Sequence, residues 1–274
     1  MAVIEKKERS IFIAMDDMVI LSAAGIRIGY KNKTADTVVA DAVSLNLKKG
    51  SLTALIGANG IGKSTLLRTI TGIQKPLSGT VLLHNKSLTT YSQKELAQNL
   101  SIVLTEGLPP SNLTVYELVA LGRQPYTNWL GTLAPNDIKK VNEALELTQL
   151  TALAGKKHYE ISDGQLQKVL IARALAQDTP VIILDEPTTH LDLVHKVSLL
   201  KLLKELTSET GKCILYSTHD LDLALQLSDE LIVMTPEDTT QGTPEILMEQ
   251  NIFDDLFTDK SIVFDKRNRV FKVQ

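Results

Sequence analysis

The feature that most constrains the fold is a glycine-rich stretch, GANGIGKST, at residues 57–65. It follows the apolar run SLTALIG at 51–57 and overlaps a helical pattern that starts at Gly62. This arrangement predicts a buried strand that turns directly into a helix. In that context the spacing GxxxxGK[ST] predicts a loop whose backbone N–H groups and helix N-terminus bind phosphate. A glycine-rich turn without a ligand is the alternative.

Composition excludes several classes of protein. The 274 residues include 29 Lys+Arg and 32 Asp+Glu, which gives a net charge of −3, and 43% of them are hydrophobic. These values predict a globular chain with a full core and argue against a nucleic-acid binder held by phosphate contacts. A single cysteine, Cys213, cannot form an internal disulfide. No stretch approaches 18 uninterrupted apolar residues and the N-terminus lacks a leader pattern, so we expect any membrane role to depend on a partner.

The pattern of apolar runs predicts two kinds of sheet. Residues 17–49 are typical of antiparallel strands joined by a polar turn near 31–35. From residue 51 onward, short apolar runs alternate with helical stretches, which predicts a mainly parallel sheet. These runs are SLTALIG, TVLLH, SIVL, VIILD, CILYS and ELIVM.

Two further segments complete the expected architecture. Residues from about 93 to 177 are mostly helical in pattern, with Ser162 as the expected N-cap of the last helix. Residues from about 258 to 274 predict a terminal hairpin, because VFKV alternates after a polar turn. We therefore expect residues 1–274 to form one α/β unit. It would have a P-loop NTPase core, an N-terminal antiparallel β subdomain and an inserted helical subdomain.

Charged residues at the ends of two apolar runs suit phosphate chemistry. Asp185 and Glu186 end the run VIIL, and consecutive strand residues point to opposite sides. We expect Asp185 and the Ser64 hydroxyl to hold Mg²⁺, and Glu186 to act as general base on water. Lys63 would neutralise β- and γ-phosphate charge, and His219 would hydrogen-bond the γ-phosphate and hold Glu186. A solvated strand end and a capping histidine are the alternatives. The other histidines lack metal-ligand spacing and are expected in capping or core roles: His84, His158, His190 and His195.

Five motifs in this order make the chain resemble the ATP-binding cassette (ABC) family of ATPases. They are the loop at 57–65, the signature segment Ile161-Ser-Asp-Gly-Gln165, the pair Asp185-Glu186, the D-loop Thr189-His-Leu-Asp192, and His219. The resemblance covers most of the sequence. Tyr30 precedes the loop by about the distance at which the family places an aromatic that stacks on adenine. A plain strand aromatic is the alternative there.

The resemblance implies an ATPase that binds ATP and Mg²⁺ between two copies of itself. The signature of one chain would close over the phosphates bound by the other, using a hydroxyl, a backbone N–H and a helix dipole. Hydrolysis would remove these contacts and let the copies separate. The residues implied for the nucleotide are Tyr30, Gly57, Asn59, Gly60, Gly62, Lys63, Ser64, Thr65, Ser162, Gly164, Gln165 and Asp192.

Within the family, the chain resembles the separate ATPase subunits of importers for ferric siderophores, haem or cobalamin. The likeness lies in the run ELVALGRQPY at 117–126 and in the extended LDEPTTHLDL. It implies a peripheral protein at the cytoplasmic face of the membrane, bound to permease subunits and served indirectly by a substrate-binding protein. No nucleic acid is implied. A non-transport ABC ATPase, such as a cluster-assembly scaffold, is the alternative function.

Three aromatic residues in the helical segment, Tyr116, Tyr126 and Trp129, are candidates for a groove that receives a permease helix. A satellite core beneath a loop is the alternative reading of these side chains.

Two positions depart from the family pattern. Asp163 replaces a glycine of the signature, where its charge should repel the γ-phosphate but stabilise its own helix by about 0.3–1 kcal/mol. We therefore expect its side chain to point away from the nucleotide. Thr105 occupies the position of a glutamine that touches Mg²⁺ in the family. Either its hydroxyl or the carboxylate of Glu106 would supply the oxygen, and the alternative is that neither touches the ion.

Overall fold

The computed structural model describes residues 18–33, 35–104, 111–256, 262–266 and 269–273. Its centre is a six-stranded sheet in the order β10-β9-β3-β8-β7-β6. The parallel strands are β3 (Leu52–Gly57), β6 (Leu100–Val103), β7 (Val181–Leu184), β8 (Cys213–Ser217) and β9 (Glu230–Met234), and β10 (Thr239–Gly242) is an antiparallel edge. The predicted α/β core with a mainly parallel sheet is therefore confirmed.

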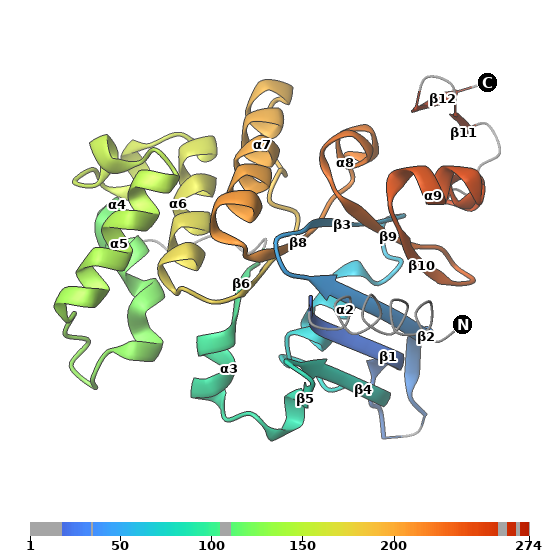
Figure 1. Cartoon of the computed structure of the whole chain (residues 1–274), viewed down its shortest axis with the longest axis horizontal. Helices are drawn as coiled ribbons and strands as arrows, with labels where there is room; N and C mark the ends of the chain where they lie inside the picture. The colour runs from blue at the N-terminus through green and yellow to red at the C-terminus, as the bar shows by residue number, and fades with distance from the viewer. Residues whose placement is uncertain (1–17, 34, 105–110, 257–261, 267–268, 274) are drawn as a thin grey trace, which may run out of the picture.

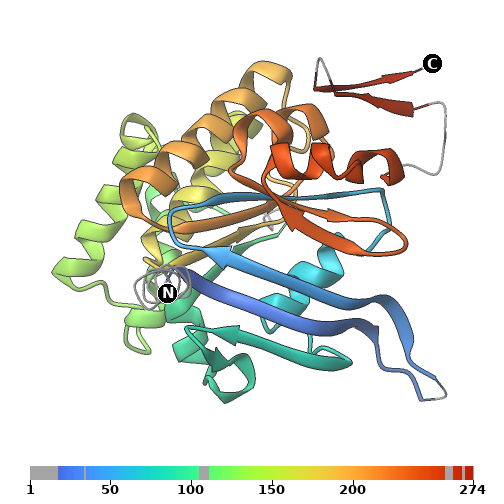
Figure 2. The same cartoon turned by 45° about the vertical axis from the view of Figure 1, so that its right-hand side comes forward.

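Layers cover both faces of this sheet (Figure 2). On one face lie α7 (Leu193–Thr210), α8 (Leu221–Leu227) and α9 (Pro244–Glu249), and on the other lie α2 (Lys63–Ile70) and a second sheet. Successive residues of β3 alternate between the two cores: Ala54 packs with the first layer and Leu55 with the second. Burial on both sides is the reason that these strands appear in the sequence as continuous apolar runs.

The second sheet is antiparallel and has the order β2-β1-β4-β5. β1 (Val19–Tyr30) pairs with β2 (Thr37–Lys48), as predicted for residues 17–49, and β4 (Ser78–Leu83) and β5 (Lys86–Ser87) complete the sheet. The prediction that TVLLH belongs to the parallel sheet is wrong, because Leu83 pairs with Leu21 of β1. A short apolar run has the same pattern in either sheet, and only its pairing partner distinguishes them.

Helices α4 (Val115–Ala120), α5 (Pro135–Leu147) and α6 (Asp163–Ala176) pack on one another beside the sheet (Figure 1). We call them the helical layer. Ser162 is the N-cap of α6, as predicted: its Oγ accepts the N–H of Gln165, whose Oε1 accepts the N–H of Ser162. The predicted helical range also contains α3 (Gln93–Asn99) and the edge strand β6.

Short elements connect and end the fold. Short 3₁₀ helices lie at Leu88–Thr90, Leu121–Tyr126, Thr151–Leu153, His158–Glu160 and Ile252–Asp255. In the segment predicted as a hairpin, β11 (Ile262–Asp265) pairs antiparallel with β12 (Val270–Val273). None of the helices in the described part of the chain combines the length and the apolar character that a bilayer span requires.

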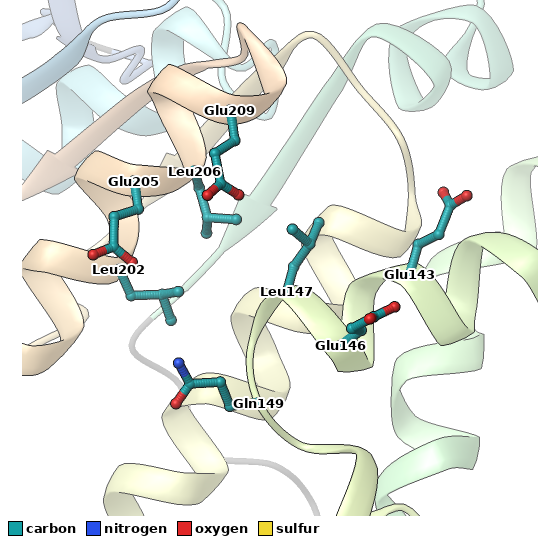
Figure 3. Close-up of a pocket in the computed structure, with 8 residues that line it drawn as sticks. All are labelled: Glu143, Glu146, Leu147, Gln149, Leu202, Glu205, Leu206 and Glu209. Atoms are coloured by element: carbon teal, nitrogen blue, oxygen red, sulfur yellow. The ribbon is translucent and has the colours of Figure 1, made fainter.

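A cleft of about 520 Å³ separates α5 from α7 (Figure 3). Leu147 of α5 points across it toward Leu202 and Leu206 of α7. Four glutamates also line it: Glu143, Glu146, Glu205 and Glu209. The helical layer is joined to the sheet at the C-terminal end of α6, where Gln177 donates to backbone carbonyls of α3 and β6.

A buried ion pair holds the helical layer together. Arg123 and Asp137 are 3% and 4% exposed, and Nε of Arg123 lies 2.9 Å from Oδ1 of Asp137. The guanidinium also donates to the carbonyl of Ala176 at 2.7 Å and lies 3.9 Å from the ring centroid of Tyr126. Burial alone would raise the pKa of Asp137, but the N–H of Ala134 and the Arg123 guanidinium hold it below its usual value.

We expect Asp137→Ala to lower the free energy of unfolding by about 3–5 kcal/mol, because it leaves the buried Arg123 charge unpaired. Denaturant titration at neutral pH measures this loss. Since the folded-state pKa of Asp137 is lowered, its contribution is complete above the ordinary carboxyl pKa and is lost as pH falls through the folded value. The difference in the free energy of unfolding between Asp137→Ala and wild type should therefore become smaller in acid. Glu245→Ala, which breaks the exposed pair with Arg269, is the control; an equal loss in both variants would contradict the prediction.

Candidate functional site

The glycine-rich loop turns from β3 into α2 at one edge of the parallel sheet. Gly60 and Gly62 adopt left-handed φ angles of 76° and 114°. A Cβ on Gly62 would lie 2.3 Å from Cγ1 of Val39, so this position requires glycine. Lys63 opens α2 with 5% exposure, and its Nζ donates to the carbonyl of Gly57 at 2.9 Å. The lysine charge therefore lies inside the loop that the sequence predicts to bind phosphate.

The electrostatic surroundings of Lys63 suit an anionic ligand. Burial lowers its pKa, while the charges of Glu186 and Asp185 act in the opposite direction. Nδ1 of His219 lies 3.5 Å from Nζ. An incoming phosphate would supply the full counter-charge that the carbonyls around this ammonium do not provide, and would favour its charged form.

Asp185 follows β7, and its carboxylate lies beside Ser64 of α2. Its Oδ1 accepts a 2.7 Å hydrogen bond from Oγ of Ser217, and Oγ of Ser64 approaches the same oxygen to 3.5 Å. A carboxylate and a hydroxyl are the oxygen donors that Mg²⁺ prefers. No cluster of three or more His, Cys, Asp or Glu suited to a metal ion occurs among the described residues. The donor set thus fits an ion that completes its coordination with phosphate oxygens and water.

Glu186 is fixed by three contacts. Its backbone has a left-handed φ of 49°, and its N–H donates to Oγ of Ser217 at 2.8 Å. Oε1 pairs with Nε2 of His219, as predicted, and Oε2 accepts a 3.2 Å hydrogen bond from Oγ1 of Thr189. A tautomer of His219 with its proton on Nε2 satisfies both Glu186 and the Lys63 contact. The carboxylate retains free lone pairs with which to accept a proton from water.

Sequence reasoning missed the roles of Ser217 and Thr189. Ser217 connects the two acidic residues, since its hydroxyl donates to Asp185 and accepts from the N–H of Glu186. The parallel pairing of Leu184 with Tyr216 places the next residue of each strand side by side. A hydroxyl residue at the end of the strand beside β7 could therefore have been recognised in the sequence, but only if the order of the strands in the sheet were known.

The structure places the remaining nucleotide candidates around the loop. The Tyr30 hydroxyl lies 3.1 Å from Oγ1 of Thr65, and the Tyr30 side chain is 46% exposed. Tyr30 also lines a hollow of about 600 Å³ with residues 73–75, which follow α2. Asn59 is exposed in the loop. An accessible ring beside the loop agrees with a stacking role, which stays a prediction.

The signature residues form a separate group. Ser162, Gly164 and Gln165 line a cleft of about 370 Å³ between the first turns of α6 and α7. Asp192 is the N-cap of α7, and Asp163 is exposed in the first turn of α6. Within the described part of one chain, no hydrogen bond joins the signature residues to Lys63, Asp185 or Glu186.

The three candidate aromatics have different surroundings. Trp129 is 92% exposed, whereas Tyr116 packs against the main core and Tyr126 is partly covered by Arg123. Only Trp129 therefore presents most of its ring to a partner. The candidate metal residues Thr105 and Glu106 lie outside the described residues.

Known proteins resemble this chain over most of its length. A family model described as ABC transporter matches residues 40–189. The iron(3+)-hydroxamate import ATP-binding protein FhuC of Bacillus subtilis is 38% identical over 249 residues, which are 90% of this chain and 91% of FhuC. The petrobactin import ATP-binding protein FpuD of Bacillus anthracis is 38% identical over 223 residues, which are 81% of this chain and 82% of FpuD.

Solved structures resemble the fold as well. The ATP-binding cassette MJ0796, in a dimeric post-hydrolysis state bound to ADP and Pi, superimposes with a TM-score of 0.69 at 29% identity. The match covers 82% of this chain and 99% of that one. A second neighbour, cbiO1 of Clostridium perfringens, part of the ABC transporter complex cbiONQ, has a TM-score of 0.74 at 33% identity and covers 86% and 93% of the two chains.

We expect Lys63→Ala to lose at least tenfold in affinity for a nucleoside triphosphate, because removing a charge-assisted contact in a buried site costs about 1.5–3 kcal/mol. Fluorescence titration with a labelled triphosphate measures the affinity. Lys49→Ala, at an exposed lysine before β3, is the matched control. Equal affinity in the two variants would show that the loop does not bind phosphate.

Proposed function

The chain belongs to the ABC transporter family as an ATP-binding and ATP-hydrolysing subunit, and on this premise we propose that it drives an importer of iron–siderophore, haem or cobalamin ligands. The observation that carries the proposal is the convergence of Lys63, Asp185, Glu186 and His219 at one edge of the parallel sheet. The choice of substrate class is supported by relatives named for the import of petrobactin and iron(3+)-hydroxamate.

The contacts within one chain support a separate role in hydrolysis for each of three residues. Lys63 binds the β- and γ-phosphates, as the loop spacing predicts. Glu186 accepts a proton from the attacking water, and its carboxylate is oriented by His219 and Thr189. His219 lies between the base and Lys63, so it can detect the γ-phosphate and hold the base at the same time.

The oxygens of Ser64 and Asp185 would hold Mg²⁺, which when bound offsets phosphate charge during transfer. The Ser217 hydroxyl donates to Oδ1 of Asp185 and so orients this carboxylate. The same hydroxyl accepts the N–H of Glu186, so the two acids are positioned by one side chain.

A single chain has only half of the proposed site. The signature residues Ser162, Gly164 and Gln165 make no hydrogen bond to the phosphate loop of their own chain within the described residues. We therefore propose that the nucleotide is enclosed by a second copy, whose signature helix presents its N-terminus to the γ-phosphate. The dimeric form of the cassette MJ0796 supports this arrangement.

Permease subunits are the proposed membrane partners, and a substrate-binding protein would act indirectly through them. The exposed Trp129 and the neighbouring Leu130, which is 66% exposed, form an apolar patch beside the helical layer that suits a partner helix. We place the protein at the cytoplasmic face of the membrane through this contact. The neighbour cbiO1, part of the complex cbiONQ, supports such an assembly.

We expect Glu186→Gln to bind ATP, form the dimer and hydrolyse ATP at least a hundredfold more slowly, because the amide cannot accept the proton from water. Steady-state phosphate release measures hydrolysis, and sedimentation velocity measures dimerisation. The wild-type rate should rise more than linearly with protein concentration. Near-normal turnover by the variant would remove Glu186 from the role of base, and an ATP-loaded variant that stays monomeric would refute the composite site.

The import role is tested by affinity purification from membranes of cells that express the tagged chain with its chromosomal neighbours. We expect a polytopic membrane protein to co-purify. Trp129→Ala is expected to reduce its recovery severalfold, because an exposed aromatic anchor at an interface contributes strongly to binding. Recovery of only water-soluble partners would favour the non-transport alternative.

A further inference from the structure

His195 contacts two segments that the composite site uses. It lies in the first turn of α7 and lines the 370 Å³ cleft that separates this turn from the signature helix α6. Its Nδ1 lies 2.7 Å from Oδ1 of Asp192, the N-cap of α7, which also accepts the backbone N–H of His195 at 2.9 Å. These bonds hold the pKa of the Asp192 carboxyl below its usual value, so the acceptor stays ionised.

The ring of His195 rests on the signature. A Cβ placed on Gly164 would meet Cδ2 of the ring at 3.3 Å and Cγ at 3.6 Å. Because Gly164 has no side chain, the imidazole of His195 can lie directly against the backbone of the signature turn. Since Nδ1 is bonded to Asp192, the ring cannot rotate away without breaking that bond.

The same turn of α7 is also tied to the hydrolytic residues. Lys196 donates to Oδ1 of Asp220 at 2.9 Å, and Oγ1 of Thr188 donates to Oδ2 of Asp220 at 3.0 Å. Asp220 directly follows His219 in the chain. One face of the turn is thus bonded to the segment that orients Glu186, and the other lies against the signature.

We propose that His195 is a positioning residue that holds the signature turn at Gly164 in register with Asp192, so that one chain presents both segments together to its second copy. The inference rests on the proposed composite site. It assigns a role in assembling that site to a histidine for which the sequence alone predicts a capping or core role. Capping of α7 by Asp192 needs only the backbone N–H of His195, so the imidazole is free for this second task.

The test uses the full chain carrying Glu186→Gln as parent, so that ATP is bound but not consumed. His195→Ala is added, and sedimentation velocity with saturating ATP and Mg²⁺ gives the dimer dissociation constant. We expect the dimer dissociation constant to rise about tenfold. Each exposed contact should account for a factor of about three, and a symmetric dimer has two such contacts. His195→Asn keeps a donor at the position of Nδ1 and should restore part of the loss.

Two readouts separate positioning from general stability. ATP affinity of the single chain and the unfolding temperature should both stay at parental values, because no hydrogen bond within the described residues joins His195 to the Lys63 loop and its side chain is 61% exposed. His84→Asn, at an exposed histidine with a left-handed φ that asparagine tolerates, is the control and should dimerise like the parent. Parental dimerisation of His195→Ala, or a fall in ATP affinity or unfolding temperature that accounts for the loss, overturns the inference.

A second variant tests the contact itself. Gly164→Ala adds a methyl group where the ring lies, so it should weaken the parent dimer more than it weakens the His195→Ala dimer. If Gly164→Ala weakens the dimer by the same factor with and without His195→Ala, the inference is overturned, but the proposed composite site is not. Failure of the Glu186→Gln parent to dimerise with ATP would instead reject the proposed composite site, and the inference with it.

Discussion

Parallel pairing of β3, β8 and β7 is the constraint on which the site depends. The register pairs Leu55 with Ser217 and Leu184 with Tyr216, so the three strands end at one edge. A different group follows each strand at that edge: the glycine loop follows β3, the two carboxylates follow β7, and Ser217 and His219 lie at the end of β8. None of these segments could reach the others if one strand ran in the opposite direction, because its carboxyl end would lie at the far edge.

Charge at this edge is arranged to favour a polyanion. Lys63 is buried among loop carbonyls, and its pKa is lowered by that burial despite the nearby Asp185 and Glu186. Glu186 and Asp185 are in turn held by neutral or hydrogen-bonding partners, Thr189, Ser217 and His219. In the proposed mechanism a triphosphate would therefore bind to side chains that are already oriented, and little reorganisation would remain for the chemical step.

The helical layer packs on the sheet through the main apolar core, in which Val169 of α6 and Leu184 of β7 belong to one cluster. The Arg123–Asp137 pair fixes the layer internally, while the cleft between α5 and α7 leaves those two helices apart (Figure 3). The first turn of α7 contacts both sides of the proposed site: Lys196 donates to Asp220, which follows His219, and His195 lies against Gly164 of the signature. A small movement of this turn would therefore reach both halves of the proposed composite site.

Much of this protein follows from local sequence. The left-handed angle at Gly60, the cap at Ser162 and the placement of two acids after an apolar run each depend on residues only a few positions apart. Tertiary structure alone decided that TVLLH joins the antiparallel sheet, that Ser217 links Asp185 to Glu186, and that Trp129 is exposed while Tyr116 is packed. The reason is physical: the local pattern shows that a strand or a ring is apolar but not which apolar neighbour it packs against, and segments far away in the chain make that choice.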